Sequence, residues 1–214
     1  MLNVVAQADA RGITTRLADE GALDKIVDVA TSQGVVAVAP FVHVPLSSVV
    51  PDGPVLVLHE VRDPGNVGTA IRAADAAGCG VVVLSGTSVD LYNPKVLRAT
   101  AGSVFSLPIA IERDLAEVCA WAQQHGQTFA TVVRGGNDYR EQDLSGSPIF
   151  IMGNEADGLS ADDVALASTP LSIPMEGRAE SLNVGVASAL LVFEALGQRR
   201  VRGATKQFGT MDVK

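Results

Sequence analysis

The feature that most constrains the fold is an alternation of short apolar runs with amphipathic segments along most of the chain. The runs are continuous in Val, Ile and Leu and end at Gly, Pro or Asp. They predict strands at Val35–Pro40, Val55–Val61, Gly80–Ser85, Val104–Ile111, Thr128–Val133, Phe150–Gly153 and Leu171–Ile173. Between most of them the apolar spacing predicts helices at Ala22–Ser32, Val67–Ala77, Pro94–Ala101, Leu115–His125 and Leu182–Gly197.

This alternation predicts an α/β fold with a mostly parallel sheet and helices on both of its faces. Strands that are apolar along their whole length, without polar residues at every second position, are typical of sheets that are buried on both sides. Open sheets of this class bind ligands beyond the carboxyl ends of their strands. We therefore expect the chemistry in the loops that follow the strands.

The start of the chain differs from the rest. Residues 1–46 offer one helix, one strand and a polar beginning, which is too little to bury a core of their own. Residues 47–53 are rich in turn formers and are expected to be a linker. The main domain is expected at 54–203, followed by a polar tail at 204–214.

Composition indicates a soluble, cytoplasmic protein. Of the 214 residues, 47% are apolar, yet no run is long enough to span a membrane and no leader opens the chain. Cys79 and Cys119 stand among apolar residues and are expected to be reduced core residues. The three histidines are scattered, so no metal site is expected.

The net charge of −8 argues against a nucleic-acid partner, because phosphates are usually bound by basic surfaces. A local positive cleft on an acidic protein would remove this objection. The arginines near the C-terminus have an alternative role in pairing with a helix dipole. The basic residues to follow are Arg72, Lys95, Arg98, Arg134, Arg178, Arg199, Arg200 and Arg202.

The first candidate segment runs from His59 to Arg72, at the end of a predicted strand. Pro64 and Gly65 force a turn, and Asn66 is the expected N-cap of the next helix. Arg72 is expected to return to the mouth of the site. The glycine spacing fits neither a dinucleotide fingerprint nor a P-loop. An ordinary turn with a surface arginine remains an alternative.

The second candidate segment is Gly153-Asn154-Glu155, directly after an apolar run. Glycine lets a ligand approach the backbone, and the Asn and Glu side chains offer hydrogen-bonding groups. The alternative is a capped loop, since Ser160 with Asp163 fits a capping box. Glu155 is not needed for that box.

The third candidate segment is Ile173-Pro174-Met175, followed by Ser181-Leu182-Asn183 and a long apolar helix. Pro174 excludes further ladder pairing at the strand end. Ser181 is the expected cap of the helix, and Asn183 is expected within its first turn. The alternative is that Asn183 is merely a tolerated polar residue.

Together the segments match a known family in order and spacing. Asn66-x5-Arg72, Gly153-Asn154-Glu155-x2-Gly158-Leu159 and the third segment resemble the three motifs of the SpoU (TrmH-like) RNA 2′-O-ribose methyltransferases, a branch of the SPOUT superfamily. The stretch Asn93-Pro94-Lys95-x2-Arg98-x2-Ala101-Gly102 also resembles the family's segment after its first motif.

The resemblance implies a C-terminal trefoil knot, a homodimer and S-adenosyl-L-methionine as cofactor, without a metal. It implies that Asn66, Arg72, Glu155 and Asn183 line the reacting end of the site. It also implies a set of residues that hold the cofactor, namely Thr131, Val132, Gly153, Asn154, Ile173, Met175, Ser181 and Leu182.

The family's motif-one arginine has been assigned as the base that removes the 2′-hydroxyl proton. The pKa of a guanidinium, above about 12, is far from the value that favours a general base. We expect Arg72 instead to position the RNA and to stabilise the developing alkoxide, with Asn66 orienting it. Glu155 is expected to accept a hydrogen bond from this assembly or from the RNA.

The activity that the resemblance implies is methylation of a ribose 2′-hydroxyl in RNA, with ribosomal RNA as the expected substrate, as in the thiostrepton-resistance branch. That branch carries a ribosomal-protein-like RNA-binding domain first, and residues 1–46 look like the end of one. The alternatives are a tRNA 2′-O-methyltransferase or a non-catalytic RNA- or cofactor-binding relative. A nicotinamide dehydrogenase fits the alternation of elements but lacks the glycine fingerprint.

Overall fold

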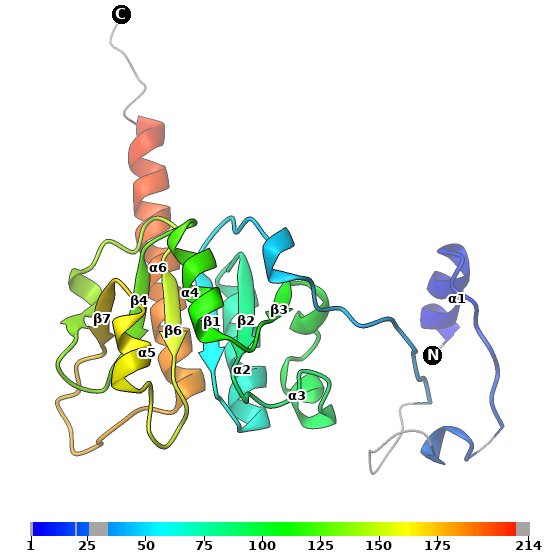
Figure 1. Cartoon of the computed structure of the whole chain (residues 1–214). Helices are drawn as coiled ribbons and strands as arrows, with labels where there is room; N and C mark the ends of the chain where they lie inside the picture. The colour runs from blue at the N-terminus through cyan, green and yellow to red at the C-terminus, as the bar shows by residue number, and fades with distance from the viewer. Residues whose placement is uncertain (1, 20, 26–33, 209–214) are drawn as a thin grey trace, which may run out of the picture. The chain divides into compact units, whose positions relative to one another are not determined.

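The computed structural model describes residues 2–19, 21–25 and 34–208 (Figure 1). The chain divides into two compact units, Met1–Phe41 and Val42–Lys214. The described elements of the first unit are α1 (Leu2–Ala10) and a 3-10 turn, η1 (Leu23–Lys25). The sequence predicted a polar start where α1 lies, and most of the predicted helix Ala22–Ser32 falls outside the described residues.

The predicted strand Val35–Pro40 is wrong. These residues have no regular secondary structure, and Val38 is 99% exposed. The alternation of Val and Ala has the right propensity, but a strand also needs a partner edge. Among the described residues of this unit there is no strand that could supply such an edge.

The second unit contains a parallel sheet, which confirms the predicted α/β class. Its strands are ordered β3-β2-β1-β6-β4-β7-β5, and each described pair is parallel. In chain order they are β1 (Val55–His59), β2 (Val81–Ser85), β3 (Ile109–Ile111), β4 (Thr128–Thr131), β5 (Asn137–Asp138), β6 (Ile149–Met152) and β7 (Thr169–Ser172).

Helices connect most of these strands. They are α2 (Pro64–Ala76), α3 (Pro94–Ala99), α4 (Leu115–Gln123), α5 (Ala161–Ala165) and α6 (Val184–Phe208), with 3-10 turns η2 (Leu46–Ser48), η3 (Ser103–Phe105) and η4 (Tyr139–Glu141). The helices α2, α3 and α4 lie close to the predicted bounds, α5 was not predicted, and α6 continues beyond its predicted end at Gly197. α6 runs through residues 204–208, so it takes up the beginning of the predicted polar tail. No helix in the described ranges is both long and apolar enough to cross a membrane.

The predicted strand Val104–Ile111 is only partly correct. Ser103–Phe105 forms η3, and the strand itself begins at Ile109. The backbone N–H of Leu107 donates to the carbonyl of Ser103 at 3.1 Å, which keeps this stretch turned. Pro108, which lacks an N–H, then separates the turn from the strand.

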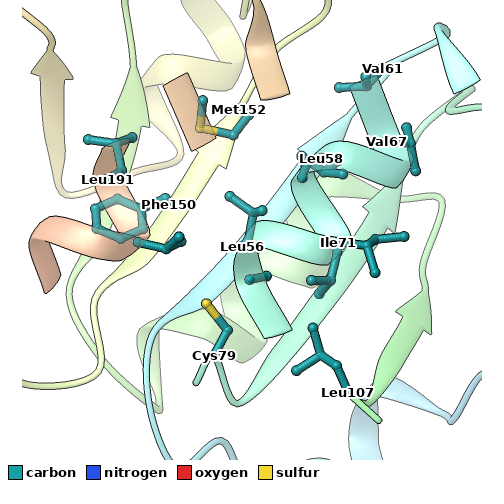
Figure 2. Packing of buried hydrophobic residues seen from close by; sticks show 14 of the residues in the cluster. Leu56, Leu58, Val61, Val67, Ile71, Cys79, Leu107, Phe150, Met152 and Leu191 are labelled. Carbon is teal, nitrogen blue, oxygen red and sulfur yellow. The ribbon is translucent and has the colours of Figure 1, made fainter. Parts of the chain in front are cut away.

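The sheet is buried on both faces, and successive residues of β1 supply different cores. Leu56 and Leu58 pack in the cluster that contains α2 and α6 (Figure 2), whereas Val55 and Val57 pack in the cluster that contains α4. Complete burial of each such side chain contributes about 2 kcal/mol. The strands therefore have to be apolar on both sides, which is why they could be recognised from the sequence.

Both cysteines are free and buried, as predicted. Cys79 belongs to the α2–α6 cluster and Cys119 to the α4 cluster. Burial raises the pKa of Cys79 to about 12, against a smaller lowering by Arg199. Burial likewise raises the pKa of Cys119 to about 11, so both residues remain thiols at neutral pH.

The segment from Val42 to β1 belongs to the second unit and contacts its strands and loops. The backbone N–H of Val44 donates to the carbonyl of Ile109 at 2.9 Å, at the open edge of β3. The hydroxyl of Tyr92 accepts from the backbone N–H of Val42 at 2.9 Å. Val49, which lies inside the stretch expected to be a linker, is buried in the α4 cluster.

α2 and α3 approach each other closely at Gly68. A Cβ atom on Gly68 would lie 2.3 Å from the Cβ of Ala99 and 3.0 Å from the carbonyl oxygen of Val96. The obstacle is a methyl group fixed to its own backbone, together with backbone atoms, and neither can swing aside. The start of α2, which carries the first motif, therefore depends on a glycine here.

We predict that Gly68→Ala lowers the free energy of unfolding by about 1–3 kcal/mol, the usual cost of overpacking. Helix propensity alone predicts the opposite sign, a gain of up to about 1 kcal/mol. Gly197→Ala is the matched control, because it lies in α6 with nothing within 4 Å of the new Cβ. Urea denaturation of both variants checks this. If Gly68→Ala were as stable as Gly197→Ala, the close approach would be refuted.

Candidate active site

Three loops that follow β1, β6 and β7 meet at the carboxyl edge of the sheet, and each carries one of the predicted motifs. β1 and β6 are neighbours in the sheet. β7 is separated from β6 by β4. The side chains of the three motifs are joined by a chain of hydrogen bonds.

Glu155, from the loop after β6, is the centre of this chain. Its carboxylate accepts hydrogen bonds from the backbone N–H of Asp63 at 3.2 Å and of Arg62 at 3.4 Å. It also accepts from the side-chain amide Nδ2 of Asn66 at 2.9 Å. The first and second motifs are thus tied together by one side chain.

Asn183 adds the third motif. Its Nδ2 donates to Oδ1 of Asn66 at 2.7 Å. Its own Oδ1 accepts from the backbone N–H groups of Gly185 at 2.9 Å and Val186 at 3.2 Å, at the start of α6. A single run of contacts therefore extends from the β1 loop through Glu155, Asn66 and Asn183 to α6.

Two predicted caps are wrong. The N-cap of α2 is Asp63, whose side chain accepts from the backbone N–H of Asn66 at 2.8 Å. The amide of Asn66 is engaged in the contacts with Glu155 and Asn183 instead. Asn183, which was expected inside the last helix, precedes it and supplies the oxygen for its first N–H groups, a role that was assigned to Ser181.

Glu155 is held as an anion. Burial raises its pKa, but hydrogen bonds from Asn66 and from the backbone N–H groups of Asp63 and Arg62 lower it more. The net result is a pKa below the usual value of 4.5. The carboxylate is therefore an acceptor at neutral pH.

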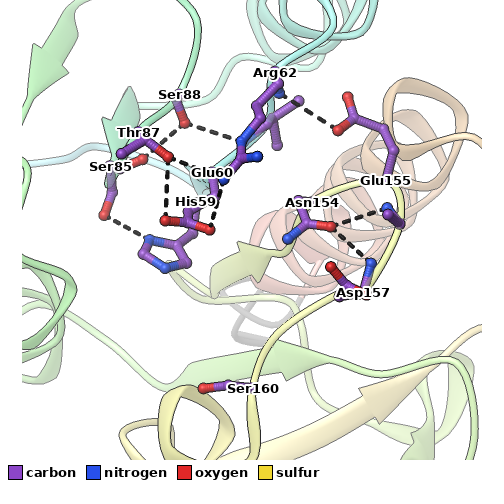
Figure 3. Close-up of polar contacts among 12 residues, drawn as sticks. His59, Glu60, Arg62, Ser85, Thr87, Ser88, Asn154, Glu155, Asp157 and Ser160 are labelled. Carbon is purple, nitrogen blue, oxygen red and sulfur yellow. Dashed lines mark hydrogen bonds and ion pairs between the residues drawn. The ribbon is translucent and has the colours of Figure 1, made fainter.

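The loop after β6 folds tightly on itself (Figure 3). Oδ1 of Asn154 accepts from the backbone N–H of Ala156 at 2.9 Å and of Asp157 at 2.7 Å. A Cβ on Gly153 would lie 2.2 Å from the backbone carbon of Gly158, so only glycine fits there. The predicted capping box of Ser160 and Asp163 is confirmed at the start of α5.

Beside this loop lies a pocket that contains all eight residues expected to hold the cofactor. Apolar side chains such as Ile173, Met175 and Leu182 line it together with backbone of the two loops. That combination suits a ligand with a flat apolar part and several hydrogen-bonding groups. The eight residues are Thr131, Val132, Gly153, Asn154, Ile173, Met175, Ser181 and Leu182.

Of the four residues expected at the reacting end, Glu155 lines the pocket, and Asn66 and Asn183 are bonded to it in one chain. Arg72 is not brought to this group. It is exposed, and it lies about 120° around α2 from Asn66 at roughly 3.6 residues per turn. It shares a helix face with Thr69, which contacts the start of α6 at Gly185. Asn66 therefore does not orient Arg72 within the described chain.

The arginines near the C-terminus lie away from the pocket. Arg199 approaches Asp52, just before β1, at 3.8 Å. Arg202 donates to the hydroxyl of Ser145 at 2.7 Å, before β6. Both contacts are at the amino edge of the sheet, opposite the three motifs. These residues therefore do not form a positive cleft at the site.

Sequence reasoning missed Asp63 and a polar cluster beside it. The pair Asp63-Pro64 was a usable indication, because proline favours the first helical position and Asp the cap before it. His59 approaches Ser85 at 3.0 Å and Asp163 at 3.9 Å. Among the described residues no group of three His, Cys, Asp or Glu side chains is placed to hold a metal ion.

A family model matches the chain over residues 53–193, that of the SpoU rRNA Methylase family. The 23S rRNA (guanosine(2553)-2′-O)-methyltransferase RlmP of Bacillus subtilis is 36% identical over 187 residues, which are 87% of this chain and 74% of RlmP. The 23S rRNA (guanosine-2′-O-)-methyltransferase RlmB of Ralstonia nicotianae is 33% identical over 94% of this chain and 84% of RlmB.

Solved structures with this fold include complexes with S-adenosylmethionine (AdoMet). An AdoMet-bound rRNA methyltransferase from Sinorhizobium meliloti has a TM-score of 0.67 and 39% identity, over 72% of this chain and 60% of that one. The SpoU methyltransferase AviRb from Streptomyces viridochromogenes, in complex with AdoMet, has a TM-score of 0.66 and 32% identity, over 72% of this chain and 63% of that one. The chain thus spans less than two thirds of either protein.

We predict that Glu155→Gln lowers stability at neutral pH by about 1 kcal/mol or less, because an amide NH2 then faces N–H donors at an exposed site. A lowered pKa stabilises the fold above the usual value of 4.5, and this contribution is lost as the pH falls through the folded-state pKa. The stability gap between wild type and variant should therefore close in acid.

Urea unfolding at neutral pH and well below 4.5 measures this gap. The exposed Glu180 is a suitable control, since Glu180→Gln should leave stability unchanged at both pH values. A gap for Glu155→Gln that is the same at both pH values would contradict the assignment of the anion.

Proposed function

Since the chain belongs to the SpoU rRNA methylase family, we propose that it transfers a methyl group from S-adenosylmethionine to a ribose 2′-hydroxyl of ribosomal RNA. The observation that carries this proposal is the joining of three separate motifs, by Glu155, Asn66 and Asn183, at the rim of one pocket. The relatives named as 23S rRNA methyltransferases support ribosomal RNA as the substrate.

The pocket fits the cofactor in its chemistry. Ile173, Met175 and Leu182 offer apolar surface for the adenine ring, and the backbone around Gly153 offers polar groups for the ribose and the amino acid part. S-adenosylmethionine supplies a methyl group that is already activated on a sulfonium. The protein then has to hold the two reactants together and stabilise charge at the ribose oxygen.

In this proposal the reacting oxygen lies beside Glu155, where the hydrogen-bond chain reaches the pocket. The 2′-oxygen forms a bond to the methyl carbon as the bond from that carbon to the sulfonium breaks, the donor leaves as a neutral thioether, and the hydroxyl proton passes to solvent water. Arg72 lies apart from this group in the chain without RNA, so we propose that it reaches the ribose oxygen only when the RNA binds along the exposed side of α2. There it stabilises the developing negative charge, since a guanidinium is a poor base. Asn66 holds Glu155 and Asn183 in place rather than orienting Arg72.

We further propose that the enzyme is a homodimer that associates through α6. Val186, Leu190 and Phe193 form a stripe at helical spacing on α6 and are 48%, 39% and 48% exposed, and Leu182, just before the helix, is 37% exposed. Apolar side chains in a row on one helix face are typical of an interface. The stripe starts at the pocket, because Leu182 lines it.

The domain organisation also remains a proposal. We assign methyl transfer to the second unit, which contains residues 54–203, and RNA binding to the first unit; the sequence alone placed the boundary after residue 46, with a linker at 47–53 and a tail at 204–214. The contacts of Val42, Val44 and Val49 favour a boundary at 41/42 instead. The family resemblance supports a trefoil knot between the loop after β6 and the start of α6, and an rRNA substrate supports a cytoplasmic location.

The test of the activity is methyl transfer from labelled S-adenosylmethionine to an unmodified 23S rRNA transcript. The product should appear as a 2′-O-methylated nucleoside after complete nuclease digestion. Unmodified tRNA is the comparison substrate. Labelling of tRNA alone, or of a base rather than a ribose, would contradict the proposal.

We predict that Arg72→Lys slows methyl transfer by about a hundredfold or more, although the charge is kept. A lysine lacks the planar fork of donors that an arginine presents to an oxyanion or a phosphate. Because Arg72 does not line the pocket, calorimetry should find unchanged affinity for S-adenosylmethionine. Single-turnover rates near those of wild type would refute this role.

We predict that Leu190→Asp yields a monomer in sedimentation equilibrium, because it places a charge in the middle of the apolar stripe. Val50→Asp is the control, since Val50 is 84% exposed but lies outside α6. The control should keep the oligomeric state of wild type. A wild-type protein that sediments as a monomer, or a Leu190→Asp variant that stays dimeric, would contradict the interface.

A further inference from the structure

A polar cluster beside Glu155 has no part in the reaction proposed above. Nη2 of Arg62 lies 3.3 Å from the hydroxyl of Thr87 and 3.5 Å from Oε2 of Glu60 (Figure 3). The hydroxyl of Thr87 donates to Oε1 of Glu60 at 3.2 Å. The loops that follow β1 and β2 thus contact the guanidinium of Arg62 at the same nitrogen, Nη2.

Glu60 adopts a conformation that glycine prefers. Its φ is +56°, in the left-handed region, which carries an energetic cost for a residue with a side chain. The surroundings hold it there, since its N–H donates to the carbonyl of Ser85 at 3.1 Å. Gly86 provides the space for the Glu60 side chain, because a Cβ on Gly86 would lie 2.8 Å from Cγ of Glu60. Backbone strain of this kind is characteristic of functional sites.

Arg62 is held but remains open to solvent. Its side chain is 67% exposed, against 32% for Glu60. Nε and Nη1 make no hydrogen bond with any residue that the structure describes, so donors on both nitrogens remain available to a ligand. A charged N–H donor of this kind forms a strong hydrogen bond with a phosphate oxygen.

The position of Arg62 suits a phosphate of the substrate. Its backbone N–H contacts Glu155, which lines the cofactor pocket, and its guanidinium extends from there toward the loop after β2. Three carboxylates, those of Glu60, Asp63 and Glu155, lie here on a protein of net charge −8. Without a cation at this place they would repel the RNA backbone.

We propose that the guanidinium of Arg62, positioned by Glu60 and Thr87, binds a phosphate of the RNA next to the target ribose. This inference rests on the proposed function for the identity of the RNA. Arg62 is the binding residue, and Glu60 and Thr87 act through it as positioning residues.

Arg62→Ala tests the contact itself. The affinity of the full chain for a 23S rRNA transcript is measured by filter binding over a series of salt concentrations. The variant should bind about tenfold more weakly, and the slope of log K against log salt should fall by about 0.7–0.9, the value for one lost phosphate contact. Affinity for S-adenosylmethionine and the urea midpoint should stay those of wild type.

Arg200→Ala is the control for loss of one positive charge. Arg200 is exposed on α6 next to Arg199, which approaches Asp52 at the amino edge of the sheet. The control should keep the salt slope of wild type. An equal loss in both arginine variants would overturn the inference, because the effect would then be one of net charge.

Positioning is tested without a change of charge by Thr87→Val, which removes only the bridging hydroxyl. We expect RNA binding about threefold weaker at unchanged stability. Glu60→Gly and Glu60→Gln form a second pair, because both lose the same charge but only Gln keeps an acceptor for Arg62. Glycine relieves the strained φ, so Glu60→Gly should be at least as stable as Glu60→Gln and yet bind RNA more weakly.

The outcomes separate this inference from the proposed function. Wild-type methylation of 23S rRNA together with unchanged RNA binding by Arg62→Ala would overturn the phosphate contact alone. No methylation by wild type, but a reduced salt slope in Arg62→Ala, would overturn the methyltransferase and leave the contact standing. Equal RNA affinities of Glu60→Gly and Glu60→Gln would overturn the positioning role.

Discussion

The carboxylate of Glu155 is the contact on which the rest of the site depends. It accepts from the backbone of the β1 loop and from Asn66, and Asn66 in turn accepts from Asn183. Hydrogen bonds to a charged group contribute about 1.5–3 kcal/mol each when they are well shielded, and less at an exposed rim such as this one. The contacts are few, but they decide how three loops with little regular structure are arranged around one pocket.

The sheet brings together the loops that make these contacts. β1 and β6 lie side by side in a parallel sheet that is apolar on both faces, so the loops that follow them emerge at the same edge. Asn66 and Asn183 are 117 residues apart in sequence and yet share a hydrogen bond. Gly68 and Gly153 let backbone segments approach so closely that a side chain would not fit. The rigid framework therefore pays the ordering entropy before any ligand arrives.

Local patterns in the sequence were sufficient for most of the buried strands and for the capping box at Ser160, whereas the residues expected to hold the cofactor came only from the family resemblance. It was insufficient where two side chains compete for one role. Asp63 and Asn66 can both cap α2, and only the tertiary contact with Glu155 decides that Asn66 is used elsewhere. Likewise, Ser181 was expected to cap α6, but the side-chain oxygen of Asn183 accepts from its first N–H groups. Val35–Pro40 was expected to be a strand, but it has no neighbouring strand to pair with. The cluster around Arg62 was not predicted, because it joins two loops that are not related by any spacing in the sequence.

The central claim is that the three motifs act as one unit through the chain from Glu155 to Asn183. A double-mutant cycle with Asn66→Ala and Asn183→Ala, measured on single-turnover methyl transfer to 23S rRNA, tests it most directly. If the two side chains work through their mutual hydrogen bond, the second substitution should cost much less once the first is present, with a coupling of about 1 kcal/mol or more. Losses that add to within about 0.3 kcal/mol would show that the motifs act independently and would contradict the account.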